Sequence, residues 1–194
     1  LLLQLALDFA SKNVKSIYIS AEESSSQIKS RANRIVKEIP ENIWIQSTQS
    51  MDEALNSIEE VDAEVVILDS IQTVMLSSIP SRAGSPTQTV ECINELVRVA
   101  KNAKKPRTIF IVCHMTKQDE MAGLRTLEHM VDSVLLLEGE SDESLRTLTS
   151  TKNRFGRTGE IGLFKMEEYG LLEIKNPSEF FVTQREKDIC GSVL

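Results

Sequence analysis

The feature that most constrains the fold is the alternation of short β-rich runs with segments of helical periodicity. Three of the β-rich runs, "SIYIS" (16–20), "EVVILDS" (64–70) and "RTIFIVC" (107–113), are separated by such segments. The last two are continuous apolar runs, which are typical of strands buried on both faces of a sheet. A fourth run, "IWIQ" (43–46), lies between the first two. The sequence therefore predicts an α/β fold with a mostly parallel sheet flanked by helices.

Serine residues mark where the helices between these strands should begin. Ser24 and Ser50 are each followed three residues later by Gln or Glu, which is the spacing of a capping box. Ser85 precedes Pro86, and proline is favoured in the first turn of a helix. In the first of these helices, the apolar spacing continues as far as Ile39.

The last third of the chain contains consecutive strand patterns with no long helix between them. Segments 131–139 and 145–155 each have the pattern of a strand, and 160–174 has the pattern of a hairpin. Such a run predicts an antiparallel β-meander, which we expect at the C-terminal edge of the parallel sheet. The predicted domains are one core over residues 1–176 and a linker over 177–194.

Charge and composition exclude several classes of protein. The chain has 22 Lys and Arg against 29 Asp and Glu, a net charge of −7, which argues against a broadly basic surface for nucleic acid. A nucleic-acid site would have to be local, on a loop or in the lumen of a ring. No run approaches the roughly 18 apolar residues of a membrane span, so no membrane partner is expected. The three cysteines form no metal-ligand pair and no disulfide pattern, which favours a cytoplasmic location.

The chain begins at Leu1, within a segment that has the pattern of a helix. The opening "LLLQLALDFA" (1–10) has no basic region before it, so a helix face is favoured over a signal peptide. We therefore expect the chain to be a piece of a longer protein.

Polar residues follow three of the predicted strands, at the point where each strand ends. Glu22 comes shortly after the first run, Asp69 ends the run at 64–70, and His114 follows the run at 107–113. Ligands of open parallel sheets bind at the carboxyl ends of the strands. The sequence therefore predicts a functional site where these three residues converge.

Asp69 ends an apolar strand in the pattern of a Walker B motif. In that motif the carboxylate holds the Mg²⁺ of a nucleoside triphosphate, because Mg²⁺ prefers oxygen ligands and keeps much of its water. Alternatively, Asp69 caps the turn that follows the strand. Asp69 is the predicted metal ligand.

Glu22 and His114 have two interpretations each. A carboxylate at Glu22 could polarise the attacking water for hydrolysis, or it could be an ordinary acid in the first turn of a helix. His114 could sense a γ-phosphate by hydrogen bonding, or it could be a buried structural histidine.

The stretch "TSTKNRFGRTGEIGLF" (149–164) concentrates cations at the end of a predicted strand. Lys152 and Arg154 are two residues apart and should therefore share one face of the strand. Cations supplied from another subunit to a phosphoryl-transfer site act as arginine fingers. The alternative is a solvated hairpin tip.

Eight segments spread over the chain carry a resemblance to a known family. They are "LLLQLA", "YISAEESSSQIKSRANRI", "VVILDSIQT", "HMTK", "AGLRTLEHMVDSVLLLEGE", "KNRFG", "EIGLFKM" and "NPSEFF". Together they resemble the RadA (Sms) family of bacterial DNA-repair ATPases, a family of RecA-like proteins, and "KNRFG" is its own signature. The resemblance implies a RecA-like P-loop NTPase core, ATP and Mg²⁺ as cofactors, and a homo-hexameric ring. It also implies ATP-driven movement on single-stranded DNA, branch migration of recombination intermediates and a recombinase partner.

The resemblance also implies roles for individual residues of the catalytic site. Asp69 would be the Walker B acid, Glu22 the water-activating carboxylate and His114 the γ-phosphate sensor. Lys152 and Arg154 would reach the ATP bound by the adjacent protomer.

Two loops, 76–85 and 115–125, correspond by resemblance to the DNA-facing loops of the RecA fold. Their candidate contacts with DNA are Arg82, Ser85, Lys117 and Arg125.

The family's glycine-rich Walker A loop and its zinc module would precede Leu1, and its Lon-protease-like domain would follow the chain. Zinc is therefore expected only in the preceding module. We expect the 194-residue chain alone to hydrolyse ATP weakly or not at all.

The predicted function is that of a DNA-dependent ATPase in recombinational DNA repair. The alternative from another class is a non-catalytic RecA-fold module that assembles without nucleotide chemistry. A RecA-like signalling ATPase of the circadian-clock type is a further alternative, and "KNRFG" argues against it.

Overall fold

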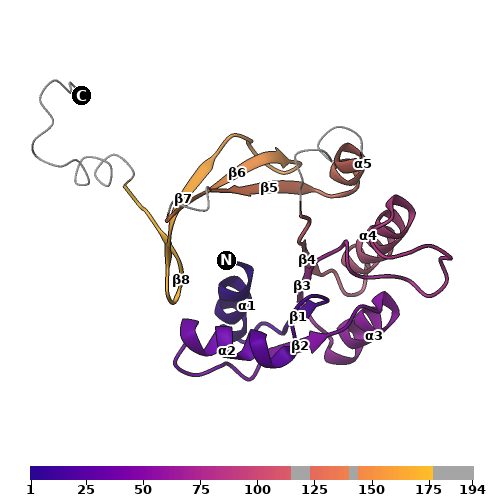
Figure 1. The fold of residues 1–194 in the computed structure, drawn as a ribbon, viewed down its shortest axis with the longest axis horizontal. Coiled ribbons are helices and arrows are strands. Elements are labelled where there is room, and N and C mark those ends of the chain that lie inside the picture. Colours follow the sequence, from indigo (N-terminus) through magenta and orange to yellow (C-terminus); the bar gives the residue numbers. More distant parts are fainter. Residues whose placement is uncertain (115–122, 140–143, 177–194) are drawn as a thin grey trace, which may run out of the picture. The chain divides into compact units, whose positions relative to one another are not determined.

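The computed structural model describes residues 1–114, 123–139 and 144–176 (Figure 1). Its contacts divide the chain into two compact units, the first over Leu1–Val131 and the second beginning at Asp132. The predicted linker over 177–194 lies outside the described residues. The extent of a single core over 1–176 therefore stays a prediction.

The first unit is built on a parallel sheet with the strand order β2-β1-β3-β4. These strands are β1 (Ser16–Ser20), β2 (Ile43–Ser47), β3 (Val65–Asp69) and β4 (Thr108–Ile111). The two central strands, β1 and β3, are almost wholly buried, which for β3 agrees with its continuous apolar sequence. The predicted mostly parallel sheet is confirmed.

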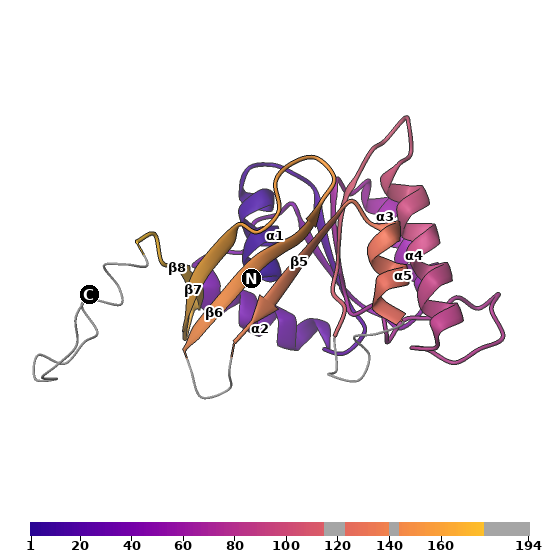
Figure 2. The ribbon, with the colours of Figure 1, turned by 90° about the horizontal axis from the view of Figure 1, so that it is seen from above.

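Two pairs of helices cover opposite faces of this sheet (Figures 1 and 2). They are α1 (Leu2–Ser11) with α2 (Ser25–Ile35), and α3 (Met51–Val61) with α4 (Pro86–Ala100). Strand alternation sorts the side chains between the faces: Tyr18 packs with the α1–α2 layer, whereas Ile17 and Ile19 pack with the α3–α4 layer. A shorter helix, α5 (Gly123–Met130), packs on the α4 side through Leu127 and Met130. In the described part of the chain, none of the helices is long and apolar enough to cross a membrane.

All three predicted helix starts are confirmed. Ser24 forms a complete capping box, and the side chains of Ser50 and Ser85 each accept a hydrogen bond from the backbone N–H three residues later. The end of α2 differs from the prediction, because the helix stops at Ile35 and does not reach Ile39. Val36 turns into extended backbone, and both Val36 and Ile39 pack against the α1–α2 core from there.

The loop before α4 is held by one buried amide, that of Gln88. The Gln88 Nε2 donates to the carbonyl oxygens of Leu76 (3.1 Å), Ile79 (3.0 Å) and Ser81 (3.0 Å), and its Oε1 accepts from the Leu76 N–H at 3.0 Å. The Gln88 side chain is fully buried. Buried backbone groups of a loop need such partners, because no water reaches them.

The second unit contains a four-stranded antiparallel sheet in sequence order. Its strands are β5 (Ser133–Glu138), β6 (Leu145–Asn153), β7 (Ile161–Glu167) and β8 (Gly170–Glu173). The predicted antiparallel meander is therefore confirmed as a set of strands. It was expected at the edge of the parallel sheet, and it forms a sheet of its own.

We predict that Gln88→Ala destabilises the first unit, because it removes the four hydrogen bonds between the buried Gln88 amide and backbone groups of the loop. Each buried group left unsatisfied costs about 1–3 kcal/mol, so the free energy of unfolding should fall by at least about 2 kcal/mol. Urea denaturation of the purified chain measures this. Asn94→Ala, on the exposed face of the same helix, is the matched control and should change stability by less than about 0.5 kcal/mol. Equal effects of the two substitutions would contradict the anchoring role of Gln88.

Candidate functional site

Parallel pairing brings the ends of three strands together at one edge of the first unit's sheet. Ser20 and Asp69 are partners in the β1–β3 register, and the Ala21 N–H donates to the Asp69 carbonyl oxygen at 2.9 Å. On the other side of β3, the Ile71 N–H donates to the Val112 carbonyl oxygen at 3.0 Å, which leads β4 toward His114. The predicted convergence of polar strand ends is therefore what the structure describes.

Glu22 lies at the centre of this edge. Its Oε1 accepts a hydrogen bond from the Ser70 hydroxyl at 2.6 Å and lies 3.5 Å from the His114 Nε2. Ser70 is fully buried, whereas the Glu22 and His114 side chains are 42% and 62% exposed. Ser70 thus fixes the carboxylate from inside the protein while its outer side stays open to a ligand.

The alternative interpretations of Glu22 and His114 do not fit this geometry. Glu22 lies before the N-cap of α2, and α2 has no acidic residue in its first turn. His114 is exposed rather than buried in the core. The backbone of His114 is held by a side chain, because the Gln72 Nε2 donates to the His114 carbonyl oxygen at 2.8 Å.

Asp69 is the last residue of β3, and its carboxylate is held on the α1–α2 face of the sheet. The Tyr18 hydroxyl donates to the Asp69 Oδ2 at 2.6 Å. Burial, followed by the hydrogen bond to Asp69 and its charge, raises the pKa of the Tyr18 phenol. Tyr18 is therefore a neutral donor, and the Asp69 side chain bonds to it instead of capping the following turn.

The donor set at this edge fits a magnesium ion shared with a nucleotide. Asp69 and Glu22 offer carboxylate oxygens, and Ser70 offers a hydroxyl. Among the described residues, no cluster of three or more His, Cys, Asp or Glu side chains could hold a metal by itself. Mg²⁺ is commonly bound by one or two carboxylates together with substrate phosphates and water, so a sparse oxygen set suits it.

Lys152 and Arg154 belong to the second unit. Strand β6 ends at Asn153, so the alternation that predicted a shared face for the two cations does not extend to Arg154. Arg154 instead forms an ion pair with Asp132, at 2.5 Å between Nη1 and Oδ1, and its N–H donates to the Asp132 carbonyl oxygen. The adjacent Phe155 side chain is 81% exposed.

Comparison with curated proteins gives a consistent result. The chain is 44% identical over all of its 194 residues to the DNA repair protein RadA of Halalkalibacterium halodurans. It is 44% identical over 192 residues, 99% of the chain, to RadA of Bacillus subtilis, and 42% identical over its full length to RadA of Rickettsia bellii. The chain is a homologue of the RadA proteins. It spans 42%, 41% and 43% of the length of these three relatives, and no protein-family model matches it.

Solved structures with the same fold include a recombinase, a DnaB-like replicative helicase and an ATPase domain. The RadB recombinase aligns over 89% of this chain and 84% of its own, with a TM-score of 0.60 and 16% identity. The ATPase domain of G40P aligns over 90% of this chain and 79% of its own, with a TM-score of 0.70 and 13% identity. At these identities the likeness shows the fold alone. The RecA-like fold expected from the RadA resemblance is thereby confirmed.

The DNA contacts implied by the RadA resemblance are only partly within the described residues. Arg82 is exposed in the loop that Gln88 anchors. The Ser85 hydroxyl is already used, because it caps α4 and donates to the Ser81 hydroxyl at 3.1 Å. Lys117 lies outside the described residues. Arg125 is in α5, and its side chain is outside what the structure describes.

Sequence reasoning missed three residues that shape the site: Ser70, Tyr18 and Arg31. A signal for Tyr18 was present, because a tyrosine in the middle of a buried strand must find a partner for its hydroxyl. Ser70 directly follows the Walker B-like acid, yet its buried position depends on the turn. Arg31 on α2 contacts the Tyr18 hydroxyl, at 3.4 Å from its Nη2, and the helical pattern alone does not indicate this contact.

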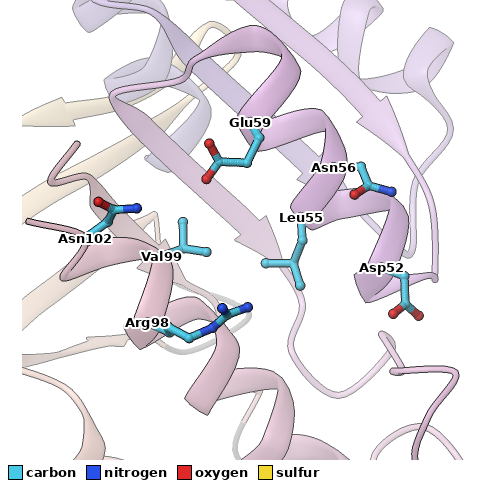
Figure 3. Close-up of a pocket in the computed structure, with 7 residues that line it drawn as sticks. All are labelled: Asp52, Leu55, Asn56, Glu59, Arg98, Val99 and Asn102. Atoms are coloured by element: carbon cyan, nitrogen blue, oxygen red, sulfur yellow. The ribbon is translucent and has the colours of Figure 1, made fainter. Parts of the chain in front are cut away.

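A cavity of about 500 Å³ lies between α3 and α4 (Figure 3). Five of its seven lining residues are polar, and the two apolar ones, Leu55 on α3 and Val99 on α4, lie on opposite walls. None of the predicted site residues lines it, so we do not assign the site to this cavity. The lining residues are Asp52, Leu55, Asn56, Glu59, Arg98, Val99 and Asn102.

We predict that Arg154→Ala changes the free energy of unfolding by no more than about 1 kcal/mol, because its ion pair with Asp132 is solvent-exposed. Arg157→Ala, three residues away and also exposed, is the matched control. Urea denaturation of both variants measures the difference. A loss well above that limit for Arg154→Ala alone would show that Arg154 is mainly a structural anchor.

Proposed function

We propose that the protein to which this chain belongs is a DNA-dependent ATPase of the RadA type that acts in recombinational DNA repair. The observation that supports this best is the convergence of Asp69, Glu22 and His114 at the carboxyl edge of a RecA-like sheet. Homology to RadA over the whole chain supports the same proposal.

In this proposal each residue at the carboxyl edge of the sheet has a separate role in ATP hydrolysis. Asp69 holds the magnesium ion, which when bound neutralises charge on the phosphates. Glu22 orients the attacking water and accepts its proton, while the buried Ser70 hydroxyl fixes the Glu22 carboxylate. His114 senses the γ-phosphate by hydrogen bonding, and its Nε2 lies 3.5 Å from the Glu22 Oε1.

The DNA partner is proposed to be single-stranded DNA and branched recombination intermediates, contacted through the loop that carries Arg82. The chain has a net charge of −7, so the cations of the proposed DNA-facing loops must be gathered around the DNA, as in the lumen of a homo-hexameric ring. Movement on DNA, branch migration, a recombinase partner and a cytoplasmic location belong to the same proposal.

We predict that Asp69→Asn and Glu22→Gln in the complete protein each lower ATP turnover by about 100-fold or more, because each removes a carboxylate that acts in the transition state. Phosphate release with Mg²⁺, with and without single-stranded DNA, measures this. Asp8→Asn and Glu60→Gln are exposed controls on α1 and α3 and should turn over normally.

DNA stimulation of the unaltered protein should fall steeply as salt rises, because phosphate contacts release counterions. Nucleotide binding without hydrolysis, and without any effect of DNA, would instead favour the non-catalytic assembly module.

We further propose that Lys152 and Arg154 act on the ATP held by the neighbouring protomer. The ion pair between Arg154 and Asp132 is exposed and therefore costs little to break, so it does not prevent such a role.

Arg154→Ala should lower turnover about 1,000-fold or more while ATP binding is retained, because an arginine finger stabilises the transition state. Mixing Arg154→Ala with Asp69→Ala protein should restore part of the activity, since each supplies what the other lacks. Arg157→Ala is the control. Unchanged turnover in Arg154→Ala would return this stretch to a solvated hairpin tip.

A further inference from the structure

The carboxylate of Asp69 is approached from the α1–α2 side of the sheet by a residue with no assigned role. Tyr18 lies in the middle of β1, is 3% exposed, and donates its hydroxyl to the Asp69 Oδ2 at 2.6 Å. Among the described residues, no hydrogen bond to the other oxygen, Oδ1, is found. The phenol therefore fixes one oxygen of Asp69 and leaves the other for a ligand.

Tyr18 is in turn contacted from helix α2. The Arg31 Nη2 lies 3.4 Å from the Tyr18 hydroxyl oxygen and 2.7 Å from the Glu23 Oε2, and the Arg31 Nη1 lies 3.2 Å from the Glu23 Oε1. A guanidinium paired through both arms to a carboxylate is held in one orientation. This chain of contacts connects α2 to the end of β3. The side chains of Arg31 and Glu23 are 34% and 36% exposed.

The same contacts separate two adjacent carboxylates. Glu22 turns toward Ser70 and His114, whereas Glu23 turns toward Arg31. The backbone N–H groups of both residues donate to the Ser20 hydroxyl, at 3.3 and 3.0 Å, so the turn that carries them is fixed. Arg31 neutralises Glu23 and keeps its charge away from the edge where Glu22 and Asp69 lie.

We propose that Tyr18 is a positioning residue for Asp69, that Arg31 supports it, and that together they orient the Asp69 carboxylate toward a nucleotide-bound magnesium ion. This rests on the proposed function. Neither residue touches the nucleotide in this proposal; both act through Asp69. Partners that orient a metal ligand commonly change metal affinity about 10–100-fold when they are removed.

The test uses Tyr18→Phe in the complete protein, because this change removes the hydroxyl and keeps the ring in the core. Tyr169→Phe, on a half-exposed side chain of the second unit, is the matched control. Binding of a fluorescent N-methylanthraniloyl-ADP is measured in EDTA and again during a Mg²⁺ titration. We expect Tyr18→Phe to raise the Mg²⁺ concentration that gives half of the maximal change in nucleotide binding about 10-fold or more. Nucleotide binding in EDTA should be unchanged. Tyr169→Phe should behave like the unaltered protein in both measurements.

Arg31→Lys keeps the charge but loses the paired arms that hold Glu23, and should shift the Mg²⁺ response in the same direction by a smaller factor. Because Arg31 is outside the core, this variant carries the test if circular dichroism shows that Tyr18→Phe is unfolded. An unchanged Mg²⁺ response in the folded variants, beside normal Mg²⁺-dependent binding by the unaltered protein, overturns the positioning role alone.

Two other results are also decisive. A loss of nucleotide binding in Tyr18→Phe that is equal with and without Mg²⁺ shows a structural role and overturns the inference. An unaltered protein whose nucleotide binding does not respond to Mg²⁺ overturns the proposed function, and the positioning role falls with it.

Discussion

The in-register parallel pairing of β1 with β3 is the interaction on which the rest of the site depends. It sets Ser20 opposite Asp69, so that the residues after both strands emerge side by side at one edge. It also decides which face each side chain takes. A slip of one residue would move Tyr18 from the α1–α2 face to the α3–α4 face and separate it from Asp69. The buried apolar side chains of both strands oppose such a slip, because it would exchange their packing partners.

Around this pairing, the site combines rigid inner contacts with an open outer surface. Ser70 and Tyr18, both buried, hold Glu22 and Asp69 from inside the fold. Glu22 and His114 keep much of their surface exposed. Such an arrangement places charged groups for a ligand without burying an unpaired charge, which would be costly.

The cations of the proposed function lie on segments whose positions are set by neighbouring polar groups. The loop that carries Arg82 is held by the buried amide of Gln88. Gly84 in the same loop has a φ of +73° and passes so close to the Gln72 carbonyl oxygen that a Cβ would lie 3.0 Å from it. Arg154 is placed by Asp132, the residue directly before β5. The amide anchor is buried and the ion pair is exposed, so the first fixes a loop and the second allows release.

The sequence by itself determined the elements and the polar strand ends. The serine caps, the buried β-rich runs and the residues Asp69, Glu22 and His114 all follow from local patterns, because propensity and periodicity act over a few residues. Only the tertiary structure decided which side chains meet: Tyr18 and Asp69 are 51 residues apart, Ser70 and Glu22 are 48 apart, and Arg154 and Asp132 are 22 apart. These contacts depend on strand order, register and the course of turns, which no local pattern encodes.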